Sequence, residues 1–165
     1  MLVLGIDPGS RATGYGLVNQ HRGRYHFIAA GVIKTKPRNP VPTRLATIYA
    51  GLREVIEQHS PEEVSIESIF RHKSSESALR LGQARGVALL AAAQSELPIY
   101  EYNAMTIKKS VTGTGRADKT QIARVVGMLL GRTLDLPADA TDALAIAITH
   151  IAHGRHHVAV RRQDR

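Results

Sequence analysis

The chain has 165 residues, and its 22 lysines and arginines against 14 acidic residues leave a formal net charge of +8. It contains no cysteine, which excludes disulfide frameworks, zinc fingers, iron–sulfur clusters and thiol nucleophiles and favours a reducing cytoplasm as its compartment. The length predicts a single domain, and the basic charge favours a polyanionic partner, although solubility alone also explains such an excess.

The chain opens with a predicted three-stranded meander. Leu2–Asp7 consists of β-forming residues and stops at a Pro-Gly pair. Thr13–Val18 and Tyr25–Lys34 have the same strand character, on either side of a polar turn at Gln20–Arg24. Two prolines and an asparagine then predict a loop from Lys36 to Pro42. Because no basic segment or cleavage site precedes the first strand, we expect no signal peptide.

Helices and short strands alternate over the next part of the chain. Between residues 45 and 56 the apolar positions recur at helical spacing, which predicts an amphipathic helix. Short strands are expected at Glu63–Glu67 and Ile99–Tyr102. Between them, Ser77–Gln94 is predicted to be a helix whose many Ala and Gly residues allow close packing against the sheet or a second subunit.

Three more helices complete the prediction, at Ala104–Val111, from an N-cap at Asp118 to Gly131, and at Ala138–His153. A meander followed by alternating helices and strands predicts the α/β class, with a mixed five-stranded sheet flanked by helices. We expect residues 1–154 to form one domain and residues 155–165 to be a poorly ordered basic tail. No apolar run approaches the roughly 20 residues of a membrane span, so no membrane association is expected.

Four carboxylates occupy positions where ligand sites gather in α/β proteins. Asp7 and Glu67 each end an apolar strand, and Asp139 and Asp142 lie in the first turn of the last predicted helix. Each has a structural alternative: a turn residue for Asp7, a solvated strand end for Glu67 and a helix-dipole partner for Asp139. Asp142 is harder to explain in this way, because the apolar run that follows it indicates burial.

If these carboxylates converge, they cannot all stay ionised without a counter-charge. An oxygen-only donor set favours Mg²⁺ or Mn²⁺ over Zn²⁺. Two such ions would polarise a phosphate, activate a water and stabilise a leaving oxygen, as in metal-dependent nucleases.

Five segments together resemble the RuvC family, bacterial endonucleases that resolve Holliday junctions: IDPGSRATGYG at 6–16, SIESIF at 65–70, SALRLGQARGVAL at 77–89, YEYNAMTIKKSVTGTGRADK at 100–119 and ADATDALAIAITH at 138–150. The resemblance implies a ribonuclease H-like fold, a homodimer, cooperation with the branch-migration proteins RuvA and RuvB, and a role in DNA recombination and repair. It also implies symmetric, metal-dependent cleavage of a four-way DNA junction that leaves 5′-phosphate and 3′-hydroxyl ends.

Matched by position, the family's catalytic and metal-binding residues are Asp7, Glu67, Asp139 and Asp142. One ion, held by Asp7 and Asp142 with support from Asp139, is expected to activate the attacking water. A second ion near Glu67, also bound by Asp7, is expected to stabilise the departing 3′ oxygen. Mg²⁺ is the expected cofactor, with Mn²⁺ as a substitute.

The resemblance also indicates residues that contact DNA. Lys108 and Lys119 match the family's basic DNA-contacting positions, and Lys109 and Arg116 lie close to them in the sequence. Lysines near helix ends also favour the helix dipole or remain solvated, which is the structural alternative. Phe70 is predicted to stack on an unpaired base at the crossover, with a place in the core as its alternative.

The histidines do not have the spacing of a metal site. His150 and His153 lie at the end of the last helix far from Asp142, and we expect them at the surface, as we do for residues 72, 156 and 157. Two other functions remain open, a YqgF-type nuclease acting on other nucleic acid and a catalytically silent junction-binding module. An actin-like kinase is disfavoured, because 165 residues leave no room for the second domain that it would need.

Overall fold

The computed structural model describes residues 1–68 and 75–154. Five strands and five helices lie in this part of the chain, in the order β1 (Leu2–Asp7), β2 (Ala12–His21), β3 (Arg24–Lys34), α1 (Val41–His59), β4 (Glu63–Glu67), α2 (Ser75–Ala93), β5 (Ile99–Tyr102), α3 (Ala104–Thr112), α4 (Lys119–Leu129) and α5 (Ala138–His153).

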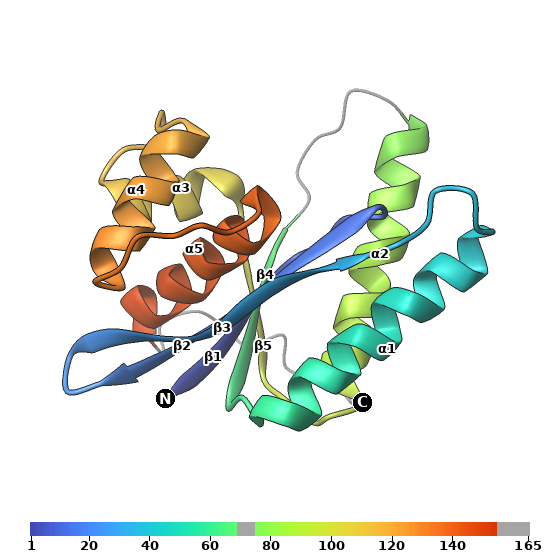
Figure 1. The fold of residues 1–165 in the computed structure, drawn as a ribbon, viewed down its shortest axis with the longest axis horizontal. Helices are drawn as coiled ribbons and strands as arrows, with labels where there is room; N and C mark the ends of the chain where they lie inside the picture. The colour runs from blue at the N-terminus through green and yellow to red at the C-terminus, as the bar shows by residue number, and fades with distance from the viewer. Residues whose placement is uncertain (69–74, 155–165) are drawn as a thin grey trace, which may run out of the picture.

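The strands form one mixed sheet in the order β3-β2-β1-β4-β5. β1, β2 and β3 pair antiparallel as a meander, whereas β4 pairs parallel with both β1 and β5. The parallel pairs need crossover connections, which α1 and α2 provide. The predicted class, a mixed five-stranded sheet flanked by helices, is therefore confirmed (Figure 1).

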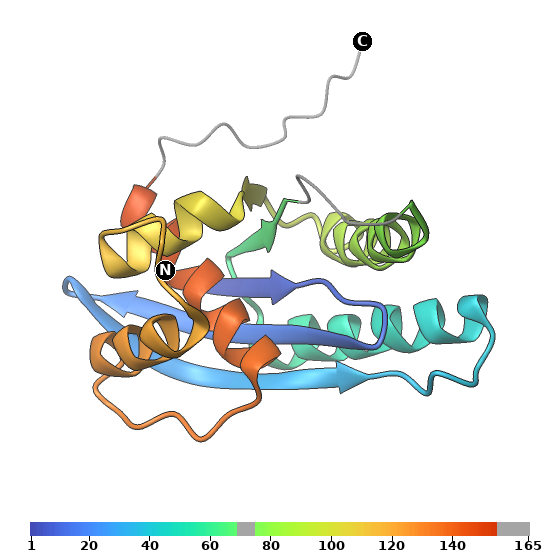
Figure 2. The same ribbon diagram turned by 90° about the horizontal axis from the view of Figure 1, so that it is seen from above.

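Helices cover both faces of the sheet, and each face has its own apolar core. Leu4, Ile6 and Leu17 point to the face covered by α1 and α2. Val3 and Val18 point to the opposite face, which is covered by α3, α4 and α5. Figures 1 and 2 show the latter three helices grouped at one side of the molecule, apart from α1 and α2. The alternation follows from the two-residue period of a strand.

Two predicted connecting segments were too long. β2 continues to His21, because the hairpin turn needs only Arg22 and Gly23, which both adopt positive φ angles of 50° and 77°. The loop expected to reach Pro42 ends at Pro40, and α1 begins at Val41. A proline in the first turn of a helix is tolerated because its missing N–H has no partner there.

Within the described residues, no helix is both long and apolar enough to cross a bilayer. The expected basic tail, 155–165, lies outside the described residues, as does the predicted base-stacking residue Phe70.

Candidate active site

The sheet register brings Asp7 and Glu67 to the same place. In the parallel pair of β1 and β4, Gly5 is the partner of Ser65. Asp7 and Glu67 each follow two residues later, so both carboxylates lie on the face under α5, at the carboxyl ends of their strands. This end of a parallel pair is where ligand sites form in open α/β sheets.

Three glycines allow α5 to lie close against the sheet. A Cβ atom on Gly5 or Gly14 would stand 2.0 Å from the carbonyl oxygen of Ala143 or Asp139, respectively, and one on Gly16 would stand 2.7 Å from a backbone nitrogen of α5. Gly14 is also the partner of Asp7 across β1 and β2. Because Gly14 on β2 has no side chain, the N-terminal end of α5, which carries Asp139 and Asp142, can approach the end of β1.

The environment of Asp7 strongly disfavours a negative charge. The pKa of its carboxyl group is raised to about 8, first by burial and then by the charges of Glu67, Asp142 and Asp139, in that order of importance. The positive charge of Lys119 acts in the opposite direction and lowers this pKa. The three other predicted acids therefore all act electrostatically on Asp7, although the sequence places the four in three distant segments.

Lys119 introduces a positive charge among these acids. Its Nζ donates a hydrogen bond to Oδ2 of Asp142 across 3.0 Å. This bond, with the charge of Asp142, raises the pKa of the lysine. Lys119 is the first residue of α4, held there by a capping box in which Asp118 and Gln121 bond to each other's backbone N–H groups.

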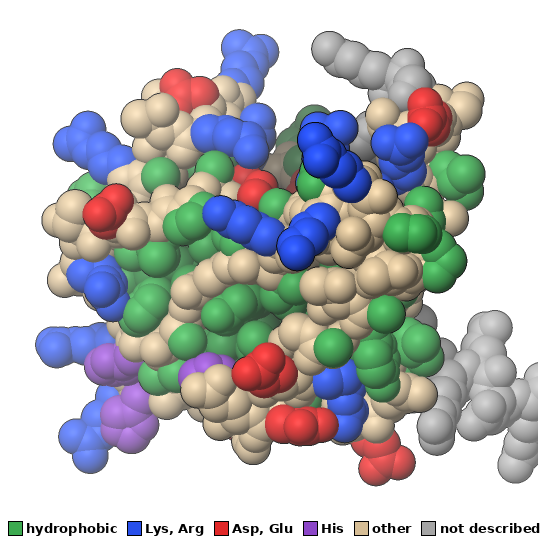
Figure 3. Space-filling model, turned by 45° about the vertical axis from the view of Figure 1, so that its right-hand side comes forward, with side chains coloured by type: hydrophobic (Ala, Val, Ile, Leu, Met, Phe, Trp, Pro, Cys, Tyr) green, Lys and Arg blue, Asp and Glu red, His purple; other side chains and the backbone are tan. Residues whose placement is uncertain are grey.

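A cleft of about 320 Å³ opens beside these residues, lined by Asp7, Glu67, Ala104, Ile107, Lys108, Lys119, Ile122, Asp142, Ala145 and Ile146. Its acids come from β1, β4 and α5, and its lysines from α3 and α4. The apolar lining keeps part of the cleft at low polarity, which strengthens electrostatic interactions there. Lys and Arg side chains crowd the upper half of the face shown in Figure 3.

The remaining predicted residues do not line this cleft. Asp139 does not line the cleft, but its charge acts on Asp7. Lys109 faces a different cavity, and Arg116 lies in the loop between α3 and α4. The structure thus separates Lys108, which lines the cleft, from its neighbour in the sequence.

The donor set fits a hard divalent cation in its chemistry. The ligands on offer are carboxylate oxygens, and the like charges around Asp7 call for a counter-ion. As the side chains stand, no three acidic or histidine residues in 1–68 and 75–154 are close enough to bind one ion together. Binding of one ion by three of these side chains would therefore require side-chain movement.

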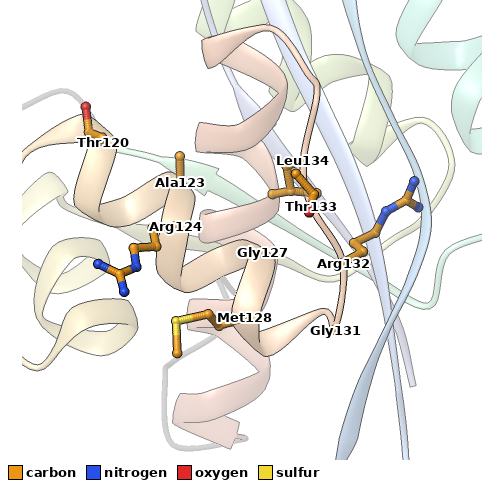
Figure 4. A pocket seen from close by; sticks show the side chains of 9 residues that line it. All are labelled: Thr120, Ala123, Arg124, Gly127, Met128, Gly131, Arg132, Thr133 and Leu134. Atoms are coloured by element: carbon orange, nitrogen blue, oxygen red, sulfur yellow. The ribbon is translucent and has the colours of Figure 1, made fainter.

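A larger cavity, of about 700 Å³, lies elsewhere, between α4 and the segment 131–134 (Figure 4). Its lining includes Arg124, Arg132 and the exposed Met128, but none of the four predicted acids. Figure 4 shows the two arginine side chains pointing away from each other. Because no acidic residue lines this larger cavity, the smaller acidic cleft is the candidate active site.

The prediction of a surface histidine was wrong for His150, which is 1% exposed. Its Nδ1 lies 2.7 Å from the hydroxyl of Tyr102, its Nε2 bonds to the carboxylate of Glu63, and the ring of Tyr100 packs against it with 4.2 Å between ring centroids. The sequence pattern did indicate that His150 is buried, because it lies four residues after Ile146 in an apolar helix and so shares a face with it.

Comparison with known proteins is consistent with this geometry. The family model described as "Crossover junction endodeoxyribonuclease RuvC" matches residues 3–150. A Proteus mirabilis protein with that description is 50% identical over 149 residues, covering 90% of this chain and 86% of the relative. The solved structure of T. thermophilus RuvC in complex with Holliday junction substrate has a TM-score of 0.86 at 35% identity, covering 93% of this chain and 94% of that one. The yeast mitochondrial Holliday junction resolvase Ydc2 shares the fold, with a TM-score of 0.65 at 16% identity over 91% of this chain and 77% of its own.

Proposed function

The chain belongs to the RuvC family of crossover junction endodeoxyribonucleases, and from this premise we propose that it resolves Holliday junctions during DNA recombination and repair by cutting two opposed strands symmetrically. One observation carries the proposal: Asp7, Glu67 and Asp142 line a single cleft together with Lys108 and Lys119. Acids alone would repel a phosphodiester, whereas lysines at the same cleft attract it.

The reaction is hydrolysis of a phosphodiester. A bond forms between a water oxygen and the phosphorus, and the bond between phosphorus and the 3′ oxygen breaks. The water loses a proton to solvent, and the 3′ oxygen gains one. The products are a 5′-phosphate and a 3′-hydroxyl, which a ligase can rejoin.

The family is one of metal-dependent nucleases, and we infer that the ions are two Mg²⁺, with Mn²⁺ able to replace them. The carboxylates of Asp7, Glu67, Asp139 and Asp142 would hold them, Asp7 being shared. When bound, such ions polarise the phosphate, lower the pKa of a water and stabilise the leaving oxygen. Lys119 holds Asp142 before binding and is then free to contact a neighbouring phosphate.

DNA contacts are assigned to basic residues next to the cleft. Lys108 and Lys119 line it, and Lys119 has a side chain 74% exposed, so it reaches solvent despite its bond to Asp142. Lys109 and Arg116 extend the basic surface beyond the cleft. Phe70 follows Glu67 by three residues, and its proposed stacking on a base rests on the sequence alone.

We propose that the active form is a homodimer, because symmetric cleavage of two strands needs two active sites. The outer side of α2 supports this proposal with an apolar stripe of exposed residues, namely Leu79, Gly82, Gly86, Leu90 and Ala93. Leu79 and Leu90 are 63% and 50% exposed. A Cβ added to either glycine would meet no atom within 4 Å, so a second helix has room to approach closely.

The resemblance to the family further suggests that RuvA and RuvB deliver the junction and that the protein acts in the cytoplasm. The lack of cysteine in all 165 residues agrees with a reducing compartment.

The function is tested by incubating the purified protein with a synthetic four-way junction and, separately, with a linear duplex of the same arm sequence. Each reaction is run with Mg²⁺, with Mn²⁺ and with a chelator. We expect paired cuts in opposed strands of the junction, only with metal, and products that DNA ligase reseals. Equal cleavage of the duplex, or cleavage in the chelator, would contradict the proposal.

A further inference from the structure

A separate cavity of about 510 Å³ lies beside α3 and is not part of the acidic cleft. It is lined by Thr106, Lys109 and Ser110 of α3 and by His153 in the last turn of α5. The first three residues are spaced at i, i+3 and i+4, so they share one side of the helix. Two sequence-distant helices thus bring four polar side chains around one hollow.

This cavity and the acidic cleft lie on opposite flanks of α3. Ala104, Ile107 and Lys108 line the cleft, whereas the residues of the cavity fall on the other side of a helix with 3.6 residues per turn. α3 is therefore a ridge between the two. Since a helix with its side chains is about 10–12 Å wide, the two sites are separated by about that distance.

The chemistry of the cavity suits a phosphate group. Two hydroxyls and an ammonium group are hydrogen-bond donors to anionic oxygens, and no carboxylate lines the cavity. His153 is held in place, because its Nδ1 donates to the carbonyl oxygen of Thr149 across 2.8 Å and the ring of Tyr102 lies 5.7 Å away. The cavity therefore offers the same ligand one charged donor, the ammonium group of Lys109, and the neutral hydroxyl donors of Thr106 and Ser110.

We propose that this cavity binds a backbone phosphate of the DNA arm that crosses α3 as it leaves the acidic cleft. The inference rests on the proposed function and adds a second phosphate site to it, built by Thr106, Lys109, Ser110 and His153. A duplex following the ridge would place one phosphate at the cleft and another on its far flank. The shared chemistry is the phosphate group, so a free phosphate is the alternative occupant.

The test separates the charged donor from the neutral ones. Binding of a four-way junction is measured over a range of salt concentrations in an Asp7→Asn background, which prevents cleavage. Lys109→Gln removes a charge, and the double variant Thr106→Val, Ser110→Ala removes only hydroxyls. Lys36→Gln is the matched control, since Lys36 is an exposed lysine in the loop before α1. Melting curves verify that each variant is folded.

We expect Lys109→Gln to weaken binding and to reduce the slope of log K against log salt by about 0.9, the value for one phosphate contact. The hydroxyl variant should weaken binding about three- to tenfold with the slope unchanged, because neutral donors release no counter-ions. Lys36→Gln should change neither. The inference is overturned if the hydroxyl variant binds like the parent, or if Lys109→Gln behaves like Lys36→Gln.

Inorganic phosphate distinguishes the two occupants. At constant ionic strength it should weaken junction binding by the parent more than by the hydroxyl variant if DNA occupies the cavity. If phosphate stabilises the parent against heat but does not compete with DNA, the cavity binds free phosphate and the inference is wrong. Because junction cleavage is measured separately, loss of this inference would leave the proposed function standing.

Discussion

Lys119 and Asp142 form a direct ion pair at the mouth of the acidic cleft, with 3.0 Å between Nζ and Oδ2. The two residues are 23 positions apart in the sequence and lie near the N-terminal ends of different helices, Lys119 in α4 and Asp142 in α5. The lysine partly offsets the charge that the four carboxylates concentrate around Asp7. Under the proposed function, a metal ion would compete with this ammonium group for Asp142, and a DNA phosphate would compete with Asp142 for Lys119.

Asp7→Asn is expected to abolish junction cleavage while leaving junction binding intact. The substitution keeps the size of the side chain but removes the charge proposed to hold both ions. Since metal ions contribute several kcal/mol to transition-state stabilisation, the single-turnover rate should fall by roughly a thousandfold or more. Denaturing gels measure cleavage, and mobility shifts measure binding. Wild-type cleavage rates in Mg²⁺ would reject the assignment.

The stability of the metal-free protein should depend on pH through Asp7. The pKa of its carboxyl group is about 8 in the folded chain, whereas an aspartate in water has a pKa of 3.8. Between these values the folded chain keeps a proton that the unfolded chain has released, so the free energy of unfolding decreases as pH rises through this window.

Asp7→Asn removes the cost of ionising this buried carboxyl group in the folded chain. We therefore expect the substitution to raise the melting temperature by several degrees more at pH 8 than at pH 5. In a chain of this size, about 1 kcal/mol corresponds to roughly 2–4 °C. Adding Mg²⁺ at pH 8 should raise the melting temperature of the parent but not of the variant. An equal difference between parent and variant at both pH values would show that Asp7 is not the group responsible.

Lys119→Ala is expected to weaken junction binding and to reduce its salt slope by about 0.9. Loss of the ion pair should also leave Asp142 without its positive partner. Titration calorimetry with Mg²⁺ should then show tighter metal binding in the absence of DNA. Arg53→Ala, on α1, removes a charge that pairs instead with Glu57 and is the control for loss of a paired cation. An unaltered salt slope for Lys119→Ala would argue against a phosphate contact.

Gly14→Ala should distort the candidate active site by pushing α5 away from the sheet. Its Cβ would stand 2.0 Å from the carbonyl oxygen of Asp139, which is backbone and has nowhere to move without shifting α5. Overpacking of this kind costs about 1–3 kcal/mol, and cleavage should fall at least tenfold as the first turn of α5 moves away from Asp7. Gly115→Ala is the control, because its Cβ meets only the flexible side chain of Met105 at 3.1 Å. A fully active, equally stable Gly14→Ala protein would show that this close approach is dispensable.

Replacing both Leu79 and Leu90 by glutamate should convert the proposed dimer into a monomer. The two side chains are largely exposed in the single chain, so replacing them should leave the fold intact. In the dimer, the new glutamates of the two subunits would be buried close to each other where the α2 helices pack, and their charges would oppose association. Sedimentation measures the association state, and paired strand cleavage should fall with it. Met128→Glu, at a still more exposed apolar position on α4, is the control. If the double variant stays dimeric, the interface lies elsewhere.

Much of the local structure followed directly from the sequence. The spacing of apolar residues predicted α1, the flanking Pro137 and Gly154 marked the ends of α5, and the capping residue Asp118 marked the start of α4. These signals are local, because a helix and its cap involve neighbouring residues. The predictions were wrong at Pro42 and at the turn around Gly23, because proline is also tolerated in the first turn of a helix and a hairpin turn can consist of only two residues.

The resemblance to the RuvC family was likewise available from five ordered motifs, and it is confirmed by the family match over residues 3–150. It identified which acids to consider. Their assignment as catalytic and metal-binding residues, and that of the DNA-contacting lysines, remains a prediction that the experiments above test.

The sequence by itself determined the elements, the charge and the identity of the candidate acids. Only the tertiary structure decided which side chains meet: the strand register set Asp7 beside Glu67, and the glycines of β1 and β2 set how closely α5 approaches them. It also separated Lys108 from Lys109 across a helix and buried His150 between Tyr102 and Glu63. These relationships depend on contacts between residues far apart in the chain, whose distances no local pattern of residues specifies.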